Sequence, residues 1–350
     1  MSIIKNKFDY IQEFRGIAIL LVILTHTTHH GYSNDIGINF FDKIIWYGHQ
    51  GVTLFFVISA FTIFYSIDIK FKTENNNYLK FILRRFFRIA PLYYLGILFY
   101  YIFLGHHNVD YKLFLNLLFL HWLNPATLND VVPGGWSITT EFTFYFFAPF
   151  LFSFLKSINK TLTFFLASVL LSRVCVSILV KIYPNADTLY YILNPLSHFP
   201  VFIVGIILYF IIIKKETIRI STLDCTLISM IILSDYILGD GTVLRVHFLA
   251  ALLFAMLVYI TYKHPLPTIL SKPLCFIGEI SFTLYISHFI LLYFILKDHH
   301  FLIVTNNNFL NWSFRFFSVL IGSIVLSYPI YRIIELPMIG IGKKLTSQKK

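Results

Sequence analysis

Two ionisable side chains interrupt an apolar segment near the start of the chain, FRGIAILLVILTH at residues 14–26. Arg15 and His26 are eleven residues apart, which in an α-helix is about three turns and a rise of about 16 Å, so both side chains share one face. Ionisable groups inside membrane helices are costly and usually functional. Because imidazole titrates near neutral pH, we interpret His26 as a general base. The alternative is an anchoring arginine and a hydrogen-bonded structural histidine.

Three arginines, Arg84, Arg85 and Arg88, begin another apolar stretch. Guanidinium groups match phosphate oxygens in bidentate fashion, which makes this cluster a candidate site for a phosphate-bearing ligand. Arg85 and Arg88 are spaced i,i+3 and therefore share a helix face. The alternative is the ordinary anchoring of a membrane helix by cytoplasmic basic residues, which applies most to Arg84.

Three further ionisable residues fall in or beside apolar segments. Glu141 is the candidate to fix the tautomer of His26 through its second ring nitrogen, and the alternative is a glutamate that locks the helix bundle. His288 is an oxyanion donor, a second acceptor-binding group or a structural histidine. Glu335 pairs with Arg15 or with the Arg85–Arg88 cluster, or it caps the last helix against Arg332.

Helical rise also predicts the depth of these groups in the membrane. Counted from the expected helix ends, His26, His288 and Glu141 all lie about 18–22 Å from the cytoplasmic edge of a hydrocarbon core of about 30 Å. We therefore expect them to share one polar chamber nearer the outer leaflet. The residues expected at its cytoplasmic mouth are Arg15, Arg85 and Arg88.

The composition identifies the environment of these helices. Of 350 residues, 57% are hydrophobic and 13% are charged, with a mean hydropathy of +0.73, which leaves too little polar surface for a soluble globule of this size. The net charge of +11 comes from basic residues between apolar spans and indicates topology, with no nucleic-acid partner expected. The isolated Cys175, Cys225 and Cys275 predict neither a disulfide nor a metal site.

Apolar segments of about 17 to 25 residues predict an all-α integral membrane fold with ten transmembrane helices. A shorter apolar piece, 111–123, is expected to be interfacial or re-entrant, because all basic clusters and both termini then face the cytoplasm. The predicted spans are 11–30, 49–67, 86–105, 137–155, 161–182, 197–213, 222–238, 244–262, 276–296 and 313–333.

A set of motifs that follow one another along nearly the whole chain resembles the membrane acyltransferase-3 family. Each motif alone is weak, but their order is specific. They are Arg15 with His26, the segments 51–61 and 84–93, Trp136-Ser137 leading to Glu141, Tyr145 and Pro149, the segment 281–288, and the closing Glu335-Leu336-Pro337.

The resemblance implies a ten-helix membrane enzyme, here one domain over residues 1–350, without a fused soluble domain. Such an enzyme moves an acyl group, usually acetyl, from cytoplasmic acyl-CoA to a hydroxyl of an extracytoplasmic glycan. It also implies essential roles for Arg15, His26, Arg85 and Arg88. The chain departs from the family pattern at Thr53, where an acid is common, and at Ala60, where glycine is usual.

Within this reading, Arg84, Arg85 and Arg88 bind the phosphates of acetyl-CoA, and the pantetheine arm spans the roughly 16 Å to His26. The expected acceptor-binding residues are Trp136, Ser137, Tyr145 and His288, although Trp136 also suits an interfacial anchor. The expected partners are acyl-CoA, a surface polysaccharide or lipid-linked glycan, and the lipid of a bacterial cytoplasmic membrane. No metal is expected.

A transporter or flippase is the alternative function. In it, Arg15, His26, Glu141 and His288 form a proton or substrate path. Common transporters show paired repeats and broken helices in corresponding halves, and neither is evident in the sequence.

Overall fold

The computed structural model describes residues 8–29, 45–73, 77–103, 111–238, 246–296, 305 and 307–347. Every regular element in these ranges is a helix, so the all-α prediction is confirmed. The chain divides into two compact units. The first unit consists of Met1–Phe55, Phe87–Gly96 and Ile260–Lys350, and the second of Phe56–Phe86 and Ile97–Tyr259.

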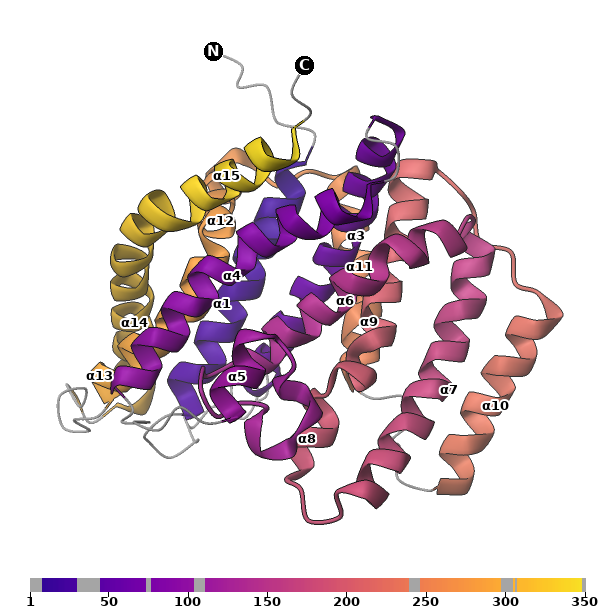
Figure 1. Ribbon diagram of the computed structural model, residues 1–350, viewed down its shortest axis with the longest axis horizontal. Helices are drawn as coiled ribbons and strands as arrows, with labels where there is room; N and C mark the ends of the chain where they lie inside the picture. Colours follow the sequence, from indigo (N-terminus) through magenta and orange to yellow (C-terminus); the bar gives the residue numbers. More distant parts are fainter. Residues whose placement is uncertain are drawn as a thin grey trace. The chain divides into compact units, whose positions relative to one another are not determined.

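The first unit is built around the first helix, α1, which packs against α12, α13 and α14. These partners all come from the last part of the chain (Figure 1). The elements of this unit are α1 (Asp9–His29), η1 (Tyr47–Gln50), the start of α3 (Gly51–Thr73), the middle of α4 (Tyr78–Phe103), the end of α11 (Val246–Lys263), α12 (Thr268–Glu279), α13 (Ser281–Leu296), α14 (Asn308–Ile330), η6 (Tyr331–Glu335) and α15 (Leu336–Thr346).

Two glycines allow α1 and α12 to approach each other at backbone distance. A Cβ atom at Gly278 would overlap the carbonyl oxygen of Gln12, and one at Gly16 would overlap that of Leu274. Small residues are typical of helix crossings in membranes because they let the backbones come close. The contact also encloses Glu13, whose fully buried carboxylate accepts a hydrogen bond from Ser271.

The expected span 276–296 is not one straight helix. The chain is helical from Thr268, and α12 and α13 meet at an angle of 75°. At Ile280 the backbone leaves the helical region, with φ −91° and ψ 7°. The prediction of 276–296 as one span is therefore not confirmed, because the chain bends where Gly278, which weakens a helix, and the charged Glu279 interrupt the apolar run.

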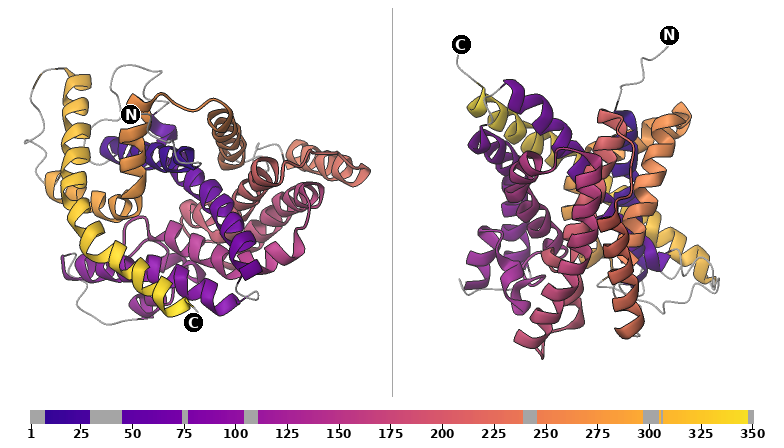
Figure 2. Two further views of the ribbon diagram at one scale, coloured as in Figure 1. Left: turned by 90° about the horizontal axis from the view of Figure 1, so that it is seen from above. Right: turned by 90° about the vertical axis from the view of Figure 1, so that its right-hand side faces the viewer.

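The second unit is centred on α9, which packs against both α6 and α7, while α10 lies beside α7 (Figures 1 and 2). Stacked aromatic rings fill this centre, with Phe202 4.2 Å from Phe144 and 4.7 Å from Phe56 between centroids. The elements of this unit are the rest of α3, α4 and α11, together with α5 (Tyr111–Leu117), η2 (His121–Leu123), η3 (Pro125–Thr127), α6 (Gly135–Phe154), α7 (Ile158–Ile182), α8 (Thr188–Leu193), α9 (Pro195–Tyr209), η4 (Phe210–Lys214) and α10 (Thr222–Leu238).

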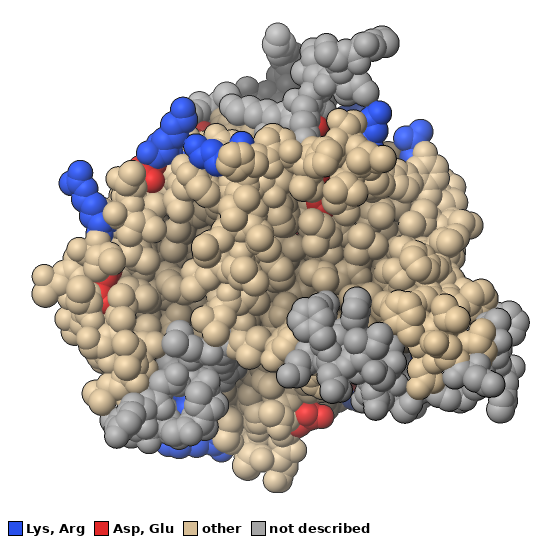
Figure 3. Space-filling model, turned by 180° about the vertical axis from the view of Figure 1, so that it is seen from behind, with Lys and Arg blue, Asp and Glu red and all other residues tan. Residues whose placement is uncertain are grey.

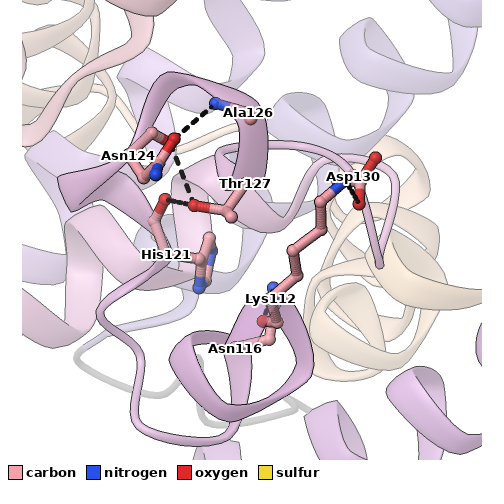
Figure 4. Close-up of polar contacts among 7 residues, drawn as sticks. All are labelled: Lys112, Asn116, His121, Asn124, Ala126, Thr127 and Asp130. Atoms are coloured by element: carbon pink, nitrogen blue, oxygen red, sulfur yellow. Dashed lines mark hydrogen bonds and ion pairs between the residues drawn. The ribbon is translucent and has the colours of Figure 1, made fainter. Parts of the chain in front are cut away.

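The segment 111–134 folds onto the start of α6. Helix α5 has seven residues, too few to cross the hydrocarbon core. It is followed by Phe119 with φ 57°, whose ring stacks on Phe142 at 4.2 Å. His121 is buried, and its Nε2 lies 3.1 Å from the carbonyl oxygen of Gly135. Figure 4 shows two further contacts: the Thr127 hydroxyl donates to the carbonyl oxygen of His121, and the Lys112–Asp130 ion pair links the two end parts of this segment.

Five helices in the described ranges are long and apolar enough to cross a membrane, or six if the bent pair α12–α13 is one span. The predicted count of ten is not confirmed. Most of the face drawn in Figure 3 belongs to uncharged residues, and large apolar side chains such as Ile333 are exposed, as expected for helices that face lipid. The five helices are Tyr47–Phe71, Ile158–Ile182, Thr188–Lys214, Val246–Lys263 and Asn308–Thr346.

The glycine contact between α1 and α12 leads to a prediction about stability. We expect Gly278→Ala to lower the free energy of unfolding by about 1–3 kcal/mol, because the added methyl group overlaps a backbone carbonyl of α1. The matched control is Gly340→Ala, since nothing lies within 4 Å of a Cβ at Gly340. Thermal unfolding of the purified protein measures both, and equal melting temperatures would contradict the prediction.

Acid is expected to loosen the segment 111–134. Burial lowers the pKa of His121 from its ordinary 6.5 to about 4, so between these values the unfolded segment binds a proton more readily than the folded one. The contribution of neutral His121 to the stability of the folded segment is therefore fully present above about pH 6.5, and it is lost as the pH falls toward 4. Hydrogen exchange of 111–134 should therefore accelerate between pH 7 and 5 relative to α7. His121→Gln, which keeps an N–H donor for Gly135 but does not titrate, should flatten this dependence.

Candidate active site

His26 and His288 lie side by side in the first unit. His26 Nδ1 is 3.0 Å from His288 Nε2, and His288 Nδ1 is 3.0 Å from the carbonyl oxygen of Leu284. A carbonyl only accepts, so His288 donates from Nδ1 and, when neutral, accepts at Nε2. His26 then donates from Nδ1 and keeps its lone pair on Nε2. The hydrogen-bond chain thus assigns the tautomer of neutral His26.

Packing holds this histidine pair in place. His288 is fully buried on α13, and its ring centroid is 4.1 Å from that of Phe289, which in turn is 4.6 Å from His26. Tyr285 lies about one helical turn before His288 on α13, and the centroids of the two rings are 5.9 Å apart. The imidazoles therefore have little room to rotate, which suits a base that must meet its substrate in one geometry.

A second polar group in the first unit contains Arg15, Arg88 and Glu335. Glu335 is 4% exposed and accepts a hydrogen bond of 2.6 Å from Thr283. The charges of Arg88 and Arg15 both act on this carboxylate. Arg15 also lies 3.4 Å from the side-chain oxygen of Gln12, one turn earlier on α1. The hydrogen-bond partner of Glu335 is thus Thr283, and the predicted pairing of Glu335 with Arg15 or with the Arg85–Arg88 cluster stays a prediction.

In the second unit, Glu141 has partners of its own. Its Oε1 accepts hydrogen bonds from the hydroxyls of Ser59 and Tyr145, each at 2.5 Å. The Tyr145 ring lies 5.5 Å from the Arg85 guanidinium, which is also over the ring of Phe81. The structure therefore brings Glu141, Tyr145 and Arg85 together. The partner identified at His26 Nδ1 is His288, so the predicted role of Glu141 as the group that fixes the tautomer stays a prediction.

Trp136 and Ser137 lie at the start of α6. The indole of Trp136 is tilted against the ring of His198, with 5.1 Å between the ring centroids. The ring of Phe56 meets the indole edge-on, with 6.1 Å between centroids. Ser137 is buried and donates its hydroxyl hydrogen to the carbonyl oxygen of Gly134, 2.9 Å away. The hydroxyl of Ser137 thus bonds back to the first turn of its own helix, and its predicted contact with an acceptor is not tested by this geometry.

Several polar residues of these helices were missed by sequence reasoning. His198 and His247 are buried with ring centroids 4.7 Å apart, and Glu279 accepts a hydrogen bond from Tyr331 at 3.0 Å. Ser59 lies within a motif segment but was given no role. The signal that identifies all four is a polar side chain inside an apolar run, the same rule that singled out His26.

The predicted site residues divide between the units. His26, His288, Arg15, Arg88 and Glu335 belong to the first, and the others belong to the second. A chamber that joins His26 to Glu141 therefore stays a prediction. The residues of the second unit are Arg84, Arg85, Trp136, Ser137, Glu141 and Tyr145.

Comparison with known proteins identifies the family. A family model described as an acyltransferase domain matches residues 8–332. The chain is also 29% identical over 262 residues to the "Putative acetyltransferase ORF330" of Acidianus two-tailed virus, a match that covers 70% of this chain and 73% of the viral protein. No solved structure matches significantly. Because the family model spans nearly the whole chain, this protein belongs to the acyltransferase-3 family.

Proposed function

We propose that the protein is an integral membrane O-acyltransferase. It moves an acyl group, most simply acetyl, from cytoplasmic acyl-CoA to a hydroxyl of a surface polysaccharide or lipid-linked glycan. The observation that carries this proposal is the His26–His288 pair, which leaves the lone pair of a neutral imidazole on His26 Nε2. Acyl transfer to an alcohol requires such a base.

In the proposed reaction, His26 Nε2 removes the proton of the acceptor hydroxyl as its oxygen attacks the thioester carbonyl. The C–S bond then breaks, and the proton passes from His26 to the departing thiolate. His288 stabilises the transient imidazolium by accepting from Nδ1–H of His26, while Leu284 holds His288 in the required tautomer. Atoms and charges balance without a metal or a further reactant.

The arginines suit the donor. Coenzyme A carries a pyrophosphate and a 3′-phosphate, and guanidinium groups bind phosphate oxygens through paired N–H donors. Arg85 and Arg88 share a face of α4 by their i,i+3 spacing. In this proposal they clamp the phosphates together with Arg84, and Arg15 lies on the path of the pantetheine arm toward His26.

The second unit supplies the proposed acceptor side. Glu141 is oriented by two hydroxyl donors at one oxygen, which suits a carboxylate that receives a hydrogen bond from a sugar hydroxyl. Tyr145 links Glu141 to Arg85. The half-buried indole of Trp136 offers an apolar surface of the kind on which sugar rings stack.

A transport function receives limited support from one feature, the broken helix α12–α13. Transporters that contain a broken helix have a second one in the corresponding half of the chain. In the described ranges α12–α13 is the single bent pair of this kind, and the family match is to acyltransferases. We therefore interpret the break as a part of the acyl-transfer site.

The proposed function is tested by comparing surface glycans from cells with and without the gene by mass spectrometry. We expect the glycans to differ by the mass of one acyl group per modified sugar. Purified protein in nanodiscs should also be stabilised by CoA. Unchanged glycans together with no stabilisation by CoA would contradict the proposal.

Variants of the histidine pair separate a proton-transfer role from a structural one. His26→Ala should lower kcat at least about a hundredfold with acyl-CoA binding retained. His288→Ala should lower kcat by roughly tenfold or more and shift the pH profile of kcat, because His26 loses the acceptor for its Nδ1–H. His288→Gln, which keeps an acceptor oxygen, should restore part of the rate. Loss of acyl-CoA binding in the alanine variants would instead indicate a structural role.

A further inference from the structure

The guanidinium of Arg85 lies over two aromatic rings within the second unit. Its central carbon is 5.4 Å from the ring centroid of Phe81 and 5.5 Å from that of Tyr145. Phe81 precedes Arg85 by about one helical turn on α4, whereas Tyr145 belongs to α6. Two different helices therefore each supply one ring to the same cation.

Hydrogen bonds fix the position of the Tyr145 ring. This buried side chain donates its hydroxyl hydrogen to Glu141 Oε1, about one turn earlier on α6, at 2.5 Å. Ser59 of α3 donates to the same oxygen. Beside them, the Tyr78 hydroxyl in the first turn of α4 donates to the carbonyl oxygen of Phe146 at 2.9 Å. The beginning of α4 is thus held against α6 at the level of Tyr145.

Aromatic rings suit a guanidinium that must also bind an anion. The face of a ring attracts a cation through the charge distribution of its π-system. A planar guanidinium can stack on such a face while its N–H donors, which lie in its own plane, bind phosphate oxygens. A carboxylate would also restrain the arginine, but it would compete with the phosphate for these donors. Because a restrained side chain loses less freedom when a ligand binds, the rings favour binding without such competition.

We propose that Tyr145 is a positioning residue for the donor, whose ring holds Arg85 in place to bind a phosphate group of coenzyme A, while Glu141 fixes the ring through its hydroxyl. The inference rests on the proposed function, in which Arg85 binds these phosphates. It gives Tyr145 a role that differs from the acceptor contact expected from the sequence. Tyr145 acts on the donor through Arg85 and touches neither the phosphates nor the acyl group.

Action through Arg85 distinguishes this role from the others that a buried tyrosine can have. Removal of the ring should weaken CoA binding only while Arg85 is present. A tyrosine that contacted CoA itself, or that only stabilised the fold, would change the Kd by the same factor with and without Arg85. A double-mutant cycle of the two residues therefore separates these roles.

The experiment titrates CoA into the full-length protein in nanodiscs by calorimetry. We expect Tyr145→Leu to raise the Kd for CoA about fivefold, the size of effect of one partly desolvated cation–π contact. Tyr145→Phe, which keeps the ring, should retain most of the affinity. In the background of Arg85→Ala, Tyr145→Leu should cause no further loss.

The matched control removes a ring of the same helix that lies under a different cation. Phe154 ends α6, and the Nζ of Lys160 lies 3.9 Å from its ring centroid. Phe154→Leu should therefore leave the Kd for CoA unchanged.

An unchanged Kd in folded Tyr145→Leu, or an equal loss with and without Arg85, would overturn this inference and leave the proposed function standing. A loss in Tyr145→Phe as large as that in Tyr145→Leu would also overturn it, because the ring is then not the group that matters. Failure of the unaltered protein to bind CoA would contradict the proposed function and, with it, the inference. If Tyr145→Leu does not fold, Tyr145→Met, which fills more of the space of the ring, replaces it with the same expected results.

Discussion

Ionisable side chains inside an apolar helix bundle must be compensated by other protein groups, because neither lipid nor a packed core solvates them. Three such groups have partners among the neighbouring side chains. His26 is bonded to His288, Glu335 to Thr283 with two arginines nearby, and Glu141 to two hydroxyls. The close crossing of α1 and α12 and the break before α13 lie in the unit that holds the first two of these pairings.

The two units contain different chemistry. The first holds a histidine pair and a cluster of arginines with a carboxylate, which suit proton transfer and the binding of an anionic donor. The second holds a carboxylate oriented by hydroxyls and an indole beside a histidine, which suit a polyhydroxylated acceptor. Helix α4 belongs to both, since Arg85 lies in the second unit and Arg88 in the first.

Sequence reasoning reached the all-α class and the family, because the apolar runs and the ordered motifs are local properties of the chain. It did not find the bend at Ile280, although Gly278 and Glu279 interrupt the apolar run there, nor the π-helical turn at Tyr331–Glu335, whose residues read as ordinary helix. The count of ten spans is not confirmed, in part because the polar residues of α1, such as Glu13 and Arg15, lower its hydropathy. His288 as the partner of His26 required the packing of α13 on α1, which spacing along the chain does not reveal.

The packing of α1 also has a consequence for biogenesis. Three of the helices that pack against it, α12, α13 and α14, lie after Ile260, so α1 is synthesised long before the α12 backbone that fits against Gly16 exists. Until then Arg15, Glu13 and His26 lack these neighbours and depend on lipid headgroups, water or the insertion machinery. Assembly of the histidine pair is therefore a late event governed by contacts between distant parts of the chain. A nascent or truncated chain without α13 lacks the pair, so a partly made chain does not hold His26 in the tautomer that His288 sets.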